Sequence, residues 1–390
     1  MSIVQNPKEW MKLTSDLIKA GFSQDDTVVT VPDGIDFEEI IEYARAADMD
    51  YALLSPLVKL ELPGEILGKV RQRLIESTLA TLAQVKAARE LDAAYEREGI
   101  RFHMLKGTVL KSIYPKPEMR EMSDIDVMIY DESLEKAEEV AKKLGYEKVE
   151  AVKHHVIYKK EPFLILEIHW SLYDKHVDKD QDVYFNDSVR ARLKAGTAYT
   201  YEFTDEDFYV YMIAHMAKHF YENGCGIRNL MDIYVFMDKY GAGLDKNYLA
   251  GELSKCGLTE FEARMRKLAE VWIEGKEPSE FEINLFSYML DSGIYGKAVN
   301  GIWGQMAKQE DLDGANMEMN YYFPKLSYMK ENYKWLDKFP FLLPAAWCIR
   351  AVHGIATGAA DRRSGLKNVD DENRKDIVEI YKKLELNFRK

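Results

Sequence analysis

Apolar residues recur at three- and four-residue steps in two stretches near the start of the chain. Residues 36–48 form the first stretch and residues 64–98 the second, and Pro63-Gly64 marks the break before the second. Such spacing places apolar side chains on one face of a helix, and Gly99 is a typical residue just beyond a helix end. Residues 1–98 are therefore predicted to form a mostly helical N-terminal region.

The pattern changes after Gly99, where short β-prone runs alternate with polar and turn residues. These runs cover residues 100–105, 125–130, 156–158 and 163–170. Between the second and third runs, residues 133–144 carry apolar side chains at helical spacing, with Asp131 as the candidate N-cap and Gly145 as the end signal. Residues 99–204 are predicted to form a small sheet with a helix.

Helical periodicity returns after Thr204, while the strand signals fade. We expect helices over residues 207–221, 228–239, 249–256, 260–273, 279–290 and 371–389. The chain is therefore predicted to be an α+β protein, in which the core of residues 99–204 is flanked by the N-terminal helices and by a C-terminal helical domain of residues 205–390.

Composition narrows the classes of function. The chain has 390 residues, 47% hydrophobic and 31% charged, which is an ordinary globular balance. Its 66 acidic side chains outnumber the 53 basic ones, and the net charge of −13 argues against a broad basic face for nucleic acid. The cysteines are too scattered for a disulfide framework or a cysteine zinc site. Because no signal peptide or membrane-length apolar run is evident, we expect a cytoplasmic protein without membrane contact.

Two carboxylates lie at the start of the second β-prone run, in the sequence Ser123-Asp124-Ile125-Asp126. Because side chains alternate along a strand, Asp124 and Asp126 should share one face, while Ile125 and Val127 face the core. Such close carboxylates repel and tend to retain a proton unless a divalent cation lies between them. Magnesium prefers these oxygen ligands together with phosphate oxygens, so the pattern favours a magnesium site over a solvated turn.

A second element precedes this pair of aspartates. Gly107 follows the first β-prone run and would let a phosphate approach the backbone, and Thr108 adds a hydroxyl donor at the expected start of a helix. Lys106 and Arg120 flank the same region, and either can pair with a nearby acid or contact phosphates. For Arg120 we favour the phosphate contact, because it lies in the loop that leads to Asp124.

The last β-prone run places Glu167 among apolar neighbours, and His169 shares its face. A buried glutamate is unfavourable unless it is paired or binds a metal ion. If this strand lies beside the Asp124 strand, Glu167 completes a trio of carboxylates that holds a second metal ion or deprotonates an acceptor hydroxyl. The alternative is an ion pair with Lys106 or Arg120.

These elements together resemble the signature of the DNA polymerase beta-like nucleotidyltransferase superfamily. More narrowly, the chain resembles a bacterial family of uncharacterised nucleotidyltransferases over residues 37–353. The narrower match is carried by Leu105-Lys106-Gly107, Tyr114-Pro115, Arg120, Asp124-Ile125-Asp126, Glu167-Ile168-His169-Trp170, His215 through His219, Arg228 and Asp232.

The resemblance implies a mixed sheet flanked by helices and a magnesium-dependent enzyme. The enzyme would transfer a nucleoside monophosphate, from ATP or another nucleoside triphosphate, to an unidentified small-molecule or protein acceptor, with pyrophosphate leaving. Two magnesium ions would be held by Asp124, Asp126 and Glu167, which are also the expected catalytic residues. The residues expected to bind the nucleotide are Lys106, Gly107, Thr108, Arg120, Lys218 and Arg228.

The basic residues of the C-terminal helices also have two readings. Lys218 and Arg228 are candidates to meet a triphosphate, because an acidic protein that binds a polyanion needs local cations. Arg228 can instead pair with Asp232, four residues further along a helix, and this is the simpler interpretation.

The histidines are interpreted mainly as structural residues. His215 and His219 share one helical face, and without an evident third zinc ligand they are expected to be hydrogen-bonded core residues. A zinc hydrolase built on the histidines is kept as a minor hypothesis. His154 and His155, beside a β-prone run, are assigned no role.

A hypothesis from a different class arises from departures from the superfamily pattern. Thr108 stands where serine or glycine is commoner, the loop from Thr108 to Asp124 is long, and the third carboxylate is glutamate rather than aspartate. The alternative function is therefore a non-catalytic nucleotide-sensing or partner-binding protein that retains the same fold.

Overall fold

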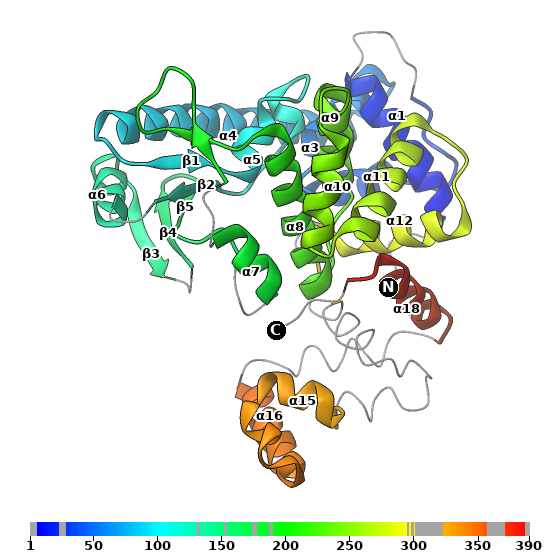
Figure 1. The fold of residues 1–390 in the computed structure, drawn as a ribbon. Coiled ribbons are helices and arrows are strands. Elements are labelled where there is room, and N and C mark those ends of the chain that lie inside the picture. The colour runs from blue at the N-terminus through cyan, green and yellow to red at the C-terminus, as the bar shows by residue number, and fades with distance from the viewer. Residues whose placement is uncertain are drawn as a thin grey trace.

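The computed structural model combines many helices with one main sheet (Figure 1). It describes residues 6–22, 29–130, 133–151, 154–173, 178–186, 190–294, 296–297, 300, 323–356 and 371–386.

The N-terminal region is helical, as predicted. Its elements are α1 (Pro7–Phe22), α2 (Phe37–Ala46), α3 (Asp50–Leu54), η1 (Ser55–Lys59) and α4 (Gly64–Arg97). Asp36 and Glu39 form a capping box at the start of α2, and Gly99, with φ of 71°, follows the end of α4. The long helix α4 extends from the other N-terminal helices to the sheet (Figure 1).

A five-stranded mixed sheet forms the core, in the order β1-β2-β5-β4-β3. The strands are β1 (Phe102–Met104), β2 (Ile125–Ile129), β3 (Glu147–Ala151), β4 (His155–Lys160) and β5 (Leu164–His169). β2 and β5 are parallel, and the other neighbouring pairs are antiparallel. The predicted α+β fold class, with a mixed sheet flanked by helices from both parts of the chain, is confirmed.

Some local features differ from the sequence-based expectation. The strand β3 was not predicted, because it is an edge strand whose residues are all exposed and lack an alternating apolar pattern. The helix α5 (Lys106–Lys111) begins before Thr108, so Gly107 and Thr108 both lie in its first turn. The helix α6 (Leu134–Lys143) follows Ser133, and the candidate N-cap Asp131 lies outside the described residues.

Strand alternation gives the sheet one apolar and one polar face. Ile125, Val127 and Leu166 are buried in a hydrophobic core that the sheet shares with the second half of α4 and with α6. Asp126 and Glu167, which alternate with these residues, line a pocket on the opposite side. The apolar face therefore anchors the sheet, and the polar face is left for chemistry.

The C-terminal part is helical, as predicted, and it packs on the N-terminal helices. Its main elements are α8 (Asp205–Asn223), α9 (Arg228–Tyr240), α10 (Lys246–Lys255), α11 (Thr259–Glu274), α12 (Glu280–Ser292) and α18 (Asp371–Leu384). One hydrophobic core joins these helices to α1, α2 and α3. Segments on either side of the sheet in sequence thus form one helical body.

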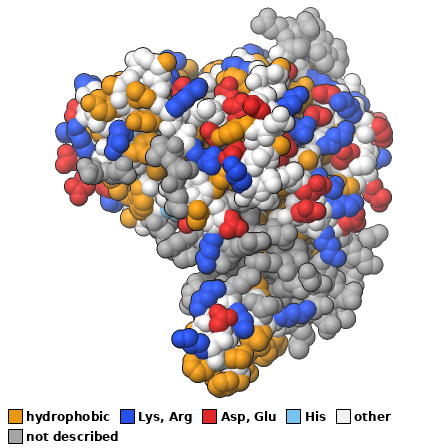
Figure 2. Space-filling view, viewed as in Figure 1, with side chains coloured by type: hydrophobic (Ala, Val, Ile, Leu, Met, Phe, Trp, Pro, Cys, Tyr) orange, Lys and Arg blue, Asp and Glu red, His pale blue; other side chains and the backbone are white. Residues whose placement is uncertain are grey.

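Smaller elements complete the described structure. They are η2 (Pro117–Met119), α7 (Lys179–Asn186), β6 (Arg192–Leu193), β7 (Tyr201–Glu202), α15 (Leu326–Asn332), η4 (Lys334–Asp337), η5 (Pro340–Leu342) and α16 (Leu343–Ala356). Met329, Leu336 and Ala346 form a small core of their own. On the face shown in Figure 2, basic and acidic side chains are interspersed over the helices. Within the described ranges, every helix is too short or too polar to cross a membrane.

The packing of α4 on the sheet predicts the effect of two matched substitutions. Leu91 is fully buried against the sheet, whereas Leu79 on the same helix is 57% exposed. Leu91→Ala should lower the free energy of unfolding by about 2–5 kcal/mol, because it removes buried contacts and leaves a cavity. Leu79→Ala should change it by less than about 0.5 kcal/mol. Denaturant unfolding followed by circular dichroism tests this, and equal losses would contradict the packing described here.

Candidate active site

A pocket of ≈420 Å³ lies between the polar face of the sheet and the helices α5, α8 and α9. Almost all of the site residues predicted from the sequence line it. They are Lys106, Gly107, Arg120, Asp124, Asp126, Glu167, Lys218 and Arg228. The remaining one, Thr108, does not. The fold thus brings residues from the sheet and from the C-terminal helices to one cavity.

The parallel pairing of β2 with β5 sets the distance between the carboxylates. Asp126 on β2 is the direct partner of Glu167 on β5 in the strand register. Because the two residues are opposite each other, their side chains project to the same face of the sheet. The expectation that the Glu167 strand lies beside the Asp124 strand is confirmed.

Asp126 is 2% exposed and has two basic neighbours. Its Oδ1 accepts a hydrogen bond from Lys106 Nζ at 2.7 Å and lies 2.8 Å from His169 Nε2. Burial alone would raise the pKa of Asp126, but Lys106 and then His169 outweigh it and hold that pKa well below its usual range. Asp126 is therefore ionised.

Asp124 lies in a different electrostatic environment. Burial and then the neighbouring charge of Asp126 raise the pKa of Asp124 to about 7. In the described structure no ion pair within 4.0 Å involves Asp124, whereas Asp126 has two. Asp124 tends to retain its proton because the nearby Lys106 and Arg228 only partly offset burial and the charge of Asp126, and a bound divalent cation would favour the ionised carboxylate. This is the observation by which the residues fit a metal ion.

Glu167 does not pair with Lys106 or Arg120, the alternative that the sequence left open. Its Oε2 lies 3.3 Å from His169 Nε2 and 3.7 Å from His155 Nε2. Burial would raise the pKa of Glu167, but the hydrogen bond from His169 and the charges of Lys106 and His155 together lower that pKa. Hydrogen bonds to Asp126 and then to Glu167 raise the pKa of His169, although burial opposes this change.

The first turn of α5 is held in an unusual conformation. Lys106 has φ of 45°, in the left-handed region that non-glycine residues seldom adopt. A Cβ atom on Gly107 would lie 3.0 Å from Met122 Cβ, so a larger residue here would push α5 away from this segment by a few tenths of an ångström. The glycine thus has a packing role here, which the sequence did not reveal.

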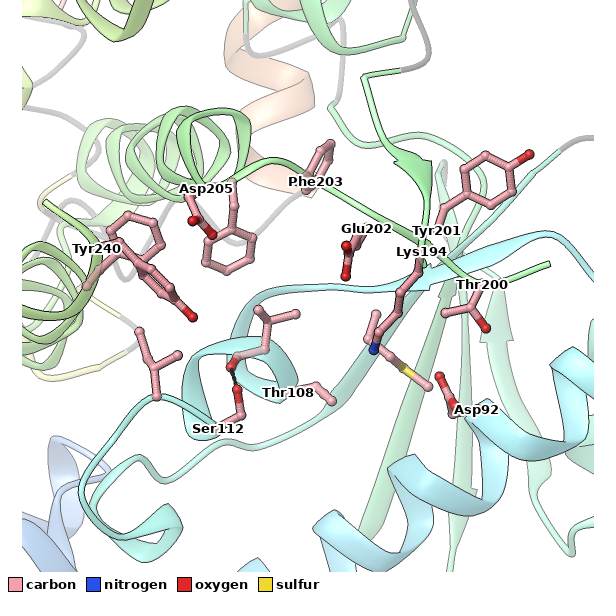
Figure 3. Close-up of a pocket in the computed structure, with 15 residues that line it drawn as sticks. Asp92, Thr108, Ser112, Lys194, Thr200, Tyr201, Glu202, Phe203, Asp205 and Tyr240 are labelled. Carbon is pink, nitrogen blue, oxygen red and sulfur yellow. Dashed lines mark hydrogen bonds between the residues drawn. The ribbon is translucent and has the colours of Figure 1, made fainter. Parts of the chain in front are cut away.

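Thr108 faces a different cavity. It lines a second pocket of ≈350 Å³ on the other side of α5, together with Asp92, Lys194 and Glu202 (Figure 3). Its Oγ1 is buried and makes no hydrogen bond with the described residues. The expectation that the Thr108 hydroxyl lies with Gly107 at the phosphates is therefore not met, because adjacent helical residues point in different directions.

Arg120 is fixed by a buried ion pair that joins the sheet region to the C-terminal helices. Its Nε donates to Asp232 Oδ1 at 2.6 Å, and Tyr114 donates its hydroxyl hydrogen to the same oxygen at 2.6 Å. Arg228 does not pair with Asp232, so the simpler helix interpretation was wrong. Its Nη1 instead pairs with Asp48 Oδ2 at 3.2 Å and donates to the backbone oxygen of Glu121 at 3.0 Å. Both arginines therefore anchor the loop that leads to Asp124.

The histidines of α8 lie in the pocket wall as neighbours. His215 Nε2 and His219 Nε2 are 3.1 Å apart, so one ring donates to the other. Desolvation by the pocket wall lowers the pKa of both rings, and the nearby Lys106 and Lys218 add to the effect. Both rings are therefore neutral at neutral pH, and they contribute no cationic charge toward a phosphate.

The position of His154 and His155 in the wall of this pocket was not predicted from the sequence. Both line the cavity beside His169, with ring centroids 4.6 Å apart. His155 is the first residue of β4 and His154 directly precedes it, and β4 pairs with β5, which carries Glu167. This position has meaning only once the strand order is known.

Comparison with known proteins identifies one relationship. A family model described as uncharacterised nucleotidyltransferase matches residues 33–274, which is more than half of the chain and includes every site residue above. No curated protein and no solved structure gives a significant match.

The raised pKa of Asp124 predicts a pH-dependent effect of Asp124→Asn on stability without metal. The folded protein holds this proton up to pH about 7, whereas an ordinary aspartate loses it near 3.8. Because the folded state binds more protons across this window, ionisation of Asp124 destabilises the fold as pH rises. Asp124→Asn removes that penalty, so it should raise Tm relative to wild type more at about pH 8 than at about pH 4.

Differential scanning calorimetry in the presence of a chelator measures this difference. Asp33→Asn, at an exposed residue, is the control, and its effect on Tm should not grow with pH. An equal effect of Asp124→Asn on Tm at both pH values would show that the pKa of Asp124 is not raised in the folded protein.

Proposed function

Because the chain belongs to the family of uncharacterised nucleotidyltransferases, we propose that it transfers a nucleoside monophosphate from ATP or another nucleoside triphosphate. The acceptor is a small molecule or a protein, and pyrophosphate is the other product. One observation carries the proposal: Asp124, Asp126 and Glu167 line one pocket, and no ion pair within 4.0 Å involves Asp124 among the described residues, so its pKa is raised to about 7.

Asp124 and Asp126 would hold magnesium in this pocket. Oδ1 of Asp126 is engaged by Lys106 and His169, so its second oxygen and the Asp124 carboxylate are the ligand atoms best placed to bind an ion. Bound magnesium would neutralise phosphate charge and stabilise the attacking and leaving oxygens. Hard oxygen ligands of this kind match the preference of magnesium.

The remaining cations of the pocket are assigned to the triphosphate. Lys218 on α8 and Arg228 at the start of α9 line the pocket, and Lys106 lies beside Asp126. Arg228 contacts Asp48 and Glu121 through Nη1, but its buried Nε has no hydrogen-bond partner among the described residues. Arg120 is a positioning residue, because its guanidinium is already bonded to Asp232 and to the backbone of Glu121. Local cations of this kind allow an acidic protein to bind a polyanion.

Glu167 is proposed to accept the proton of the acceptor hydroxyl. Its lowered pKa keeps it ionised near neutral pH, as a proton acceptor must be. His169, whose Nε2 lies 3.3 Å from Glu167 and 2.8 Å from Asp126, would hold both carboxylates in position. The base is therefore oriented by a fixed neighbour.

A nucleotide sensor without catalysis is the second candidate, and the basic partners of Asp126 favour it. Lys106 and His169 already compensate this carboxylate in the protein alone. If a nucleotide binds without displacing these contacts, the protein would bind the nucleotide but would not catalyse its transfer. Incubation with labelled triphosphate and a metabolite pool separates the two functions through pyrophosphate release.

Removal of one carboxylate should abolish magnesium-dependent nucleotide binding. Asp126→Ala is expected to weaken binding of a non-hydrolysable triphosphate by at least about 10–100-fold, because a metal ligand is lost. Isothermal titration calorimetry with magnesium measures the change. Asp92→Ala in the second pocket is the matched control and should bind as wild type does. Unchanged binding by a folded Asp126→Ala protein would count against the proposed site.

Glu167→Gln tests the role of the proton acceptor. It should retain triphosphate binding but lower the rate of pyrophosphate release by about 10²–10⁴-fold, because the amide cannot take up the acceptor proton. Single-turnover measurements over a range of nucleotide concentrations separate binding from the chemical step. A rate like that of wild type would remove Glu167 from the chemistry, and absent turnover in both proteins with intact binding would support the sensor.

A further inference from the structure

A group of imidazoles meets at the end of the sheet where β4 begins and β5 ends. His155 and His169 are direct partners in the antiparallel register of these strands. His154 precedes β4, and its backbone oxygen accepts a hydrogen bond from Trp170 N at 3.2 Å. One donor atom from each of the three histidines lies within 4.8 Å of the other two. The function proposed above gives no part to His154 or His155.

The three imidazole rings lie close to one another. Their centroids are 4.6 Å apart for His154 and His155, 4.8 Å for His155 and His169, and 5.9 Å for His154 and His169. Zinc–nitrogen bonds of about 2.0–2.1 Å place tetrahedral donor atoms about 3.4 Å apart. The observed group therefore needs only small side-chain rotations to reach that spacing, and the strand ends hold its backbone in place.

His155 has the environment of a metal ligand. Its side chain is 12% exposed, and its Nδ1 is buried without a hydrogen-bond partner among the described residues. Its other nitrogen, Nε2, lies 3.7 Å from the carboxylate of Glu167. Histidine ligands of metals commonly direct their second nitrogen to a carboxylate, which fixes the ring and its tautomer. A buried polar atom of this kind needs a partner, and the described residues do not supply one.

We propose that His154, His155 and His169 form a binding site for a first-row transition-metal ion such as Zn²⁺. Imidazole nitrogens favour these ions, whereas magnesium prefers oxygen ligands. All three histidines line the ≈420 Å³ pocket, so a fourth coordination position faces the cavity. A site with three protein ligands and one open position can exchange water for a substrate atom. The proposal does not depend on nucleotidyl transfer.

Cobalt substitution tests the site directly in the full-length, untagged protein. After treatment with a chelator, the protein is titrated with Co²⁺ in a large excess of Mg²⁺, and the visible absorption of tetrahedral Co²⁺ is recorded. We expect one Co²⁺ per chain that Mg²⁺ does not displace. His155→Gln and, separately, His154→Gln should each raise the dissociation constant for Co²⁺ by at least about tenfold.

Matched variants in the same pocket locate the ion. The double variant His215→Gln/His219→Gln removes two imidazoles from α8 and should leave Co²⁺ binding unchanged. Asp124→Asn should also retain Co²⁺ binding even where it abolishes binding of the magnesium nucleotide. This separates failure of the metal site from failure of the proposed function.

Three outcomes would overturn the proposal. The first is the absence of stoichiometric Co²⁺ binding by the wild-type protein. The second is loss of binding in the α8 double variant while His155→Gln retains it, which would move the ion to His215 and His219. The third is loss in Asp126→Ala with retention in folded His154→Gln and His155→Gln, which would place the ion on Asp126, Glu167 and His169. Circular dichroism confirms the fold of each variant.

Discussion

The ionised carboxylate of Asp126, buried between strands, is the constraint on which the pocket depends. A buried charge of this kind must be paired, and Lys106 and His169 provide its partners. Lys106 reaches Asp126 from the first turn of α5 with its backbone in a left-handed conformation. His169 reaches it from β5, where it also contacts Glu167. Asp126 Oδ1 on β2 therefore links the side chains of Lys106 on α5 and His169 on β5.

The second constraint ties the sheet to the helical body. Arg120, in the loop before β2, donates a hydrogen bond to Asp232 on α9. Arg228, at the start of α9, donates one to the backbone oxygen of Glu121 in the same loop. Breaking a buried pair of this type by removal of one partner costs about 3–5 kcal/mol, because the other charge remains buried and alone. These contacts set the position of the loop that ends at Asp124. The shape of the pocket thus depends on these contacts between the loop before β2 and the helix α9.

The polar face of the sheet carries two groups of side chains that could bind metal ions. Oxygen ligands gather where β2 and β5 run parallel, and nitrogen ligands gather where β4 pairs with β5. Glu167 lies between the two groups, since its carboxylate is near His155 as well as His169. Hard oxygen donors suit magnesium, whereas imidazoles suit transition metals. The two proposed metal sites would therefore draw mainly on different ligand types, with His169 adjacent to both.

From local periodicity, the sequence predicted α2, α4, α6, most helices after Thr204 and four of the five main strands, but not α1, α7, α15 or α16 as separate helices. It also predicted that Asp124 and Asp126 lie close together, and both line one pocket. It could not reveal β3, whose exposed residues carry no apolar pattern. Only the tertiary structure decided that Asp126 faces Glu167, that Arg120 rather than Arg228 pairs with Asp232, and that Thr108 faces another cavity. Each of these depends on strand order, helix register or distant packing, since contacts between residues far apart in sequence leave no local pattern.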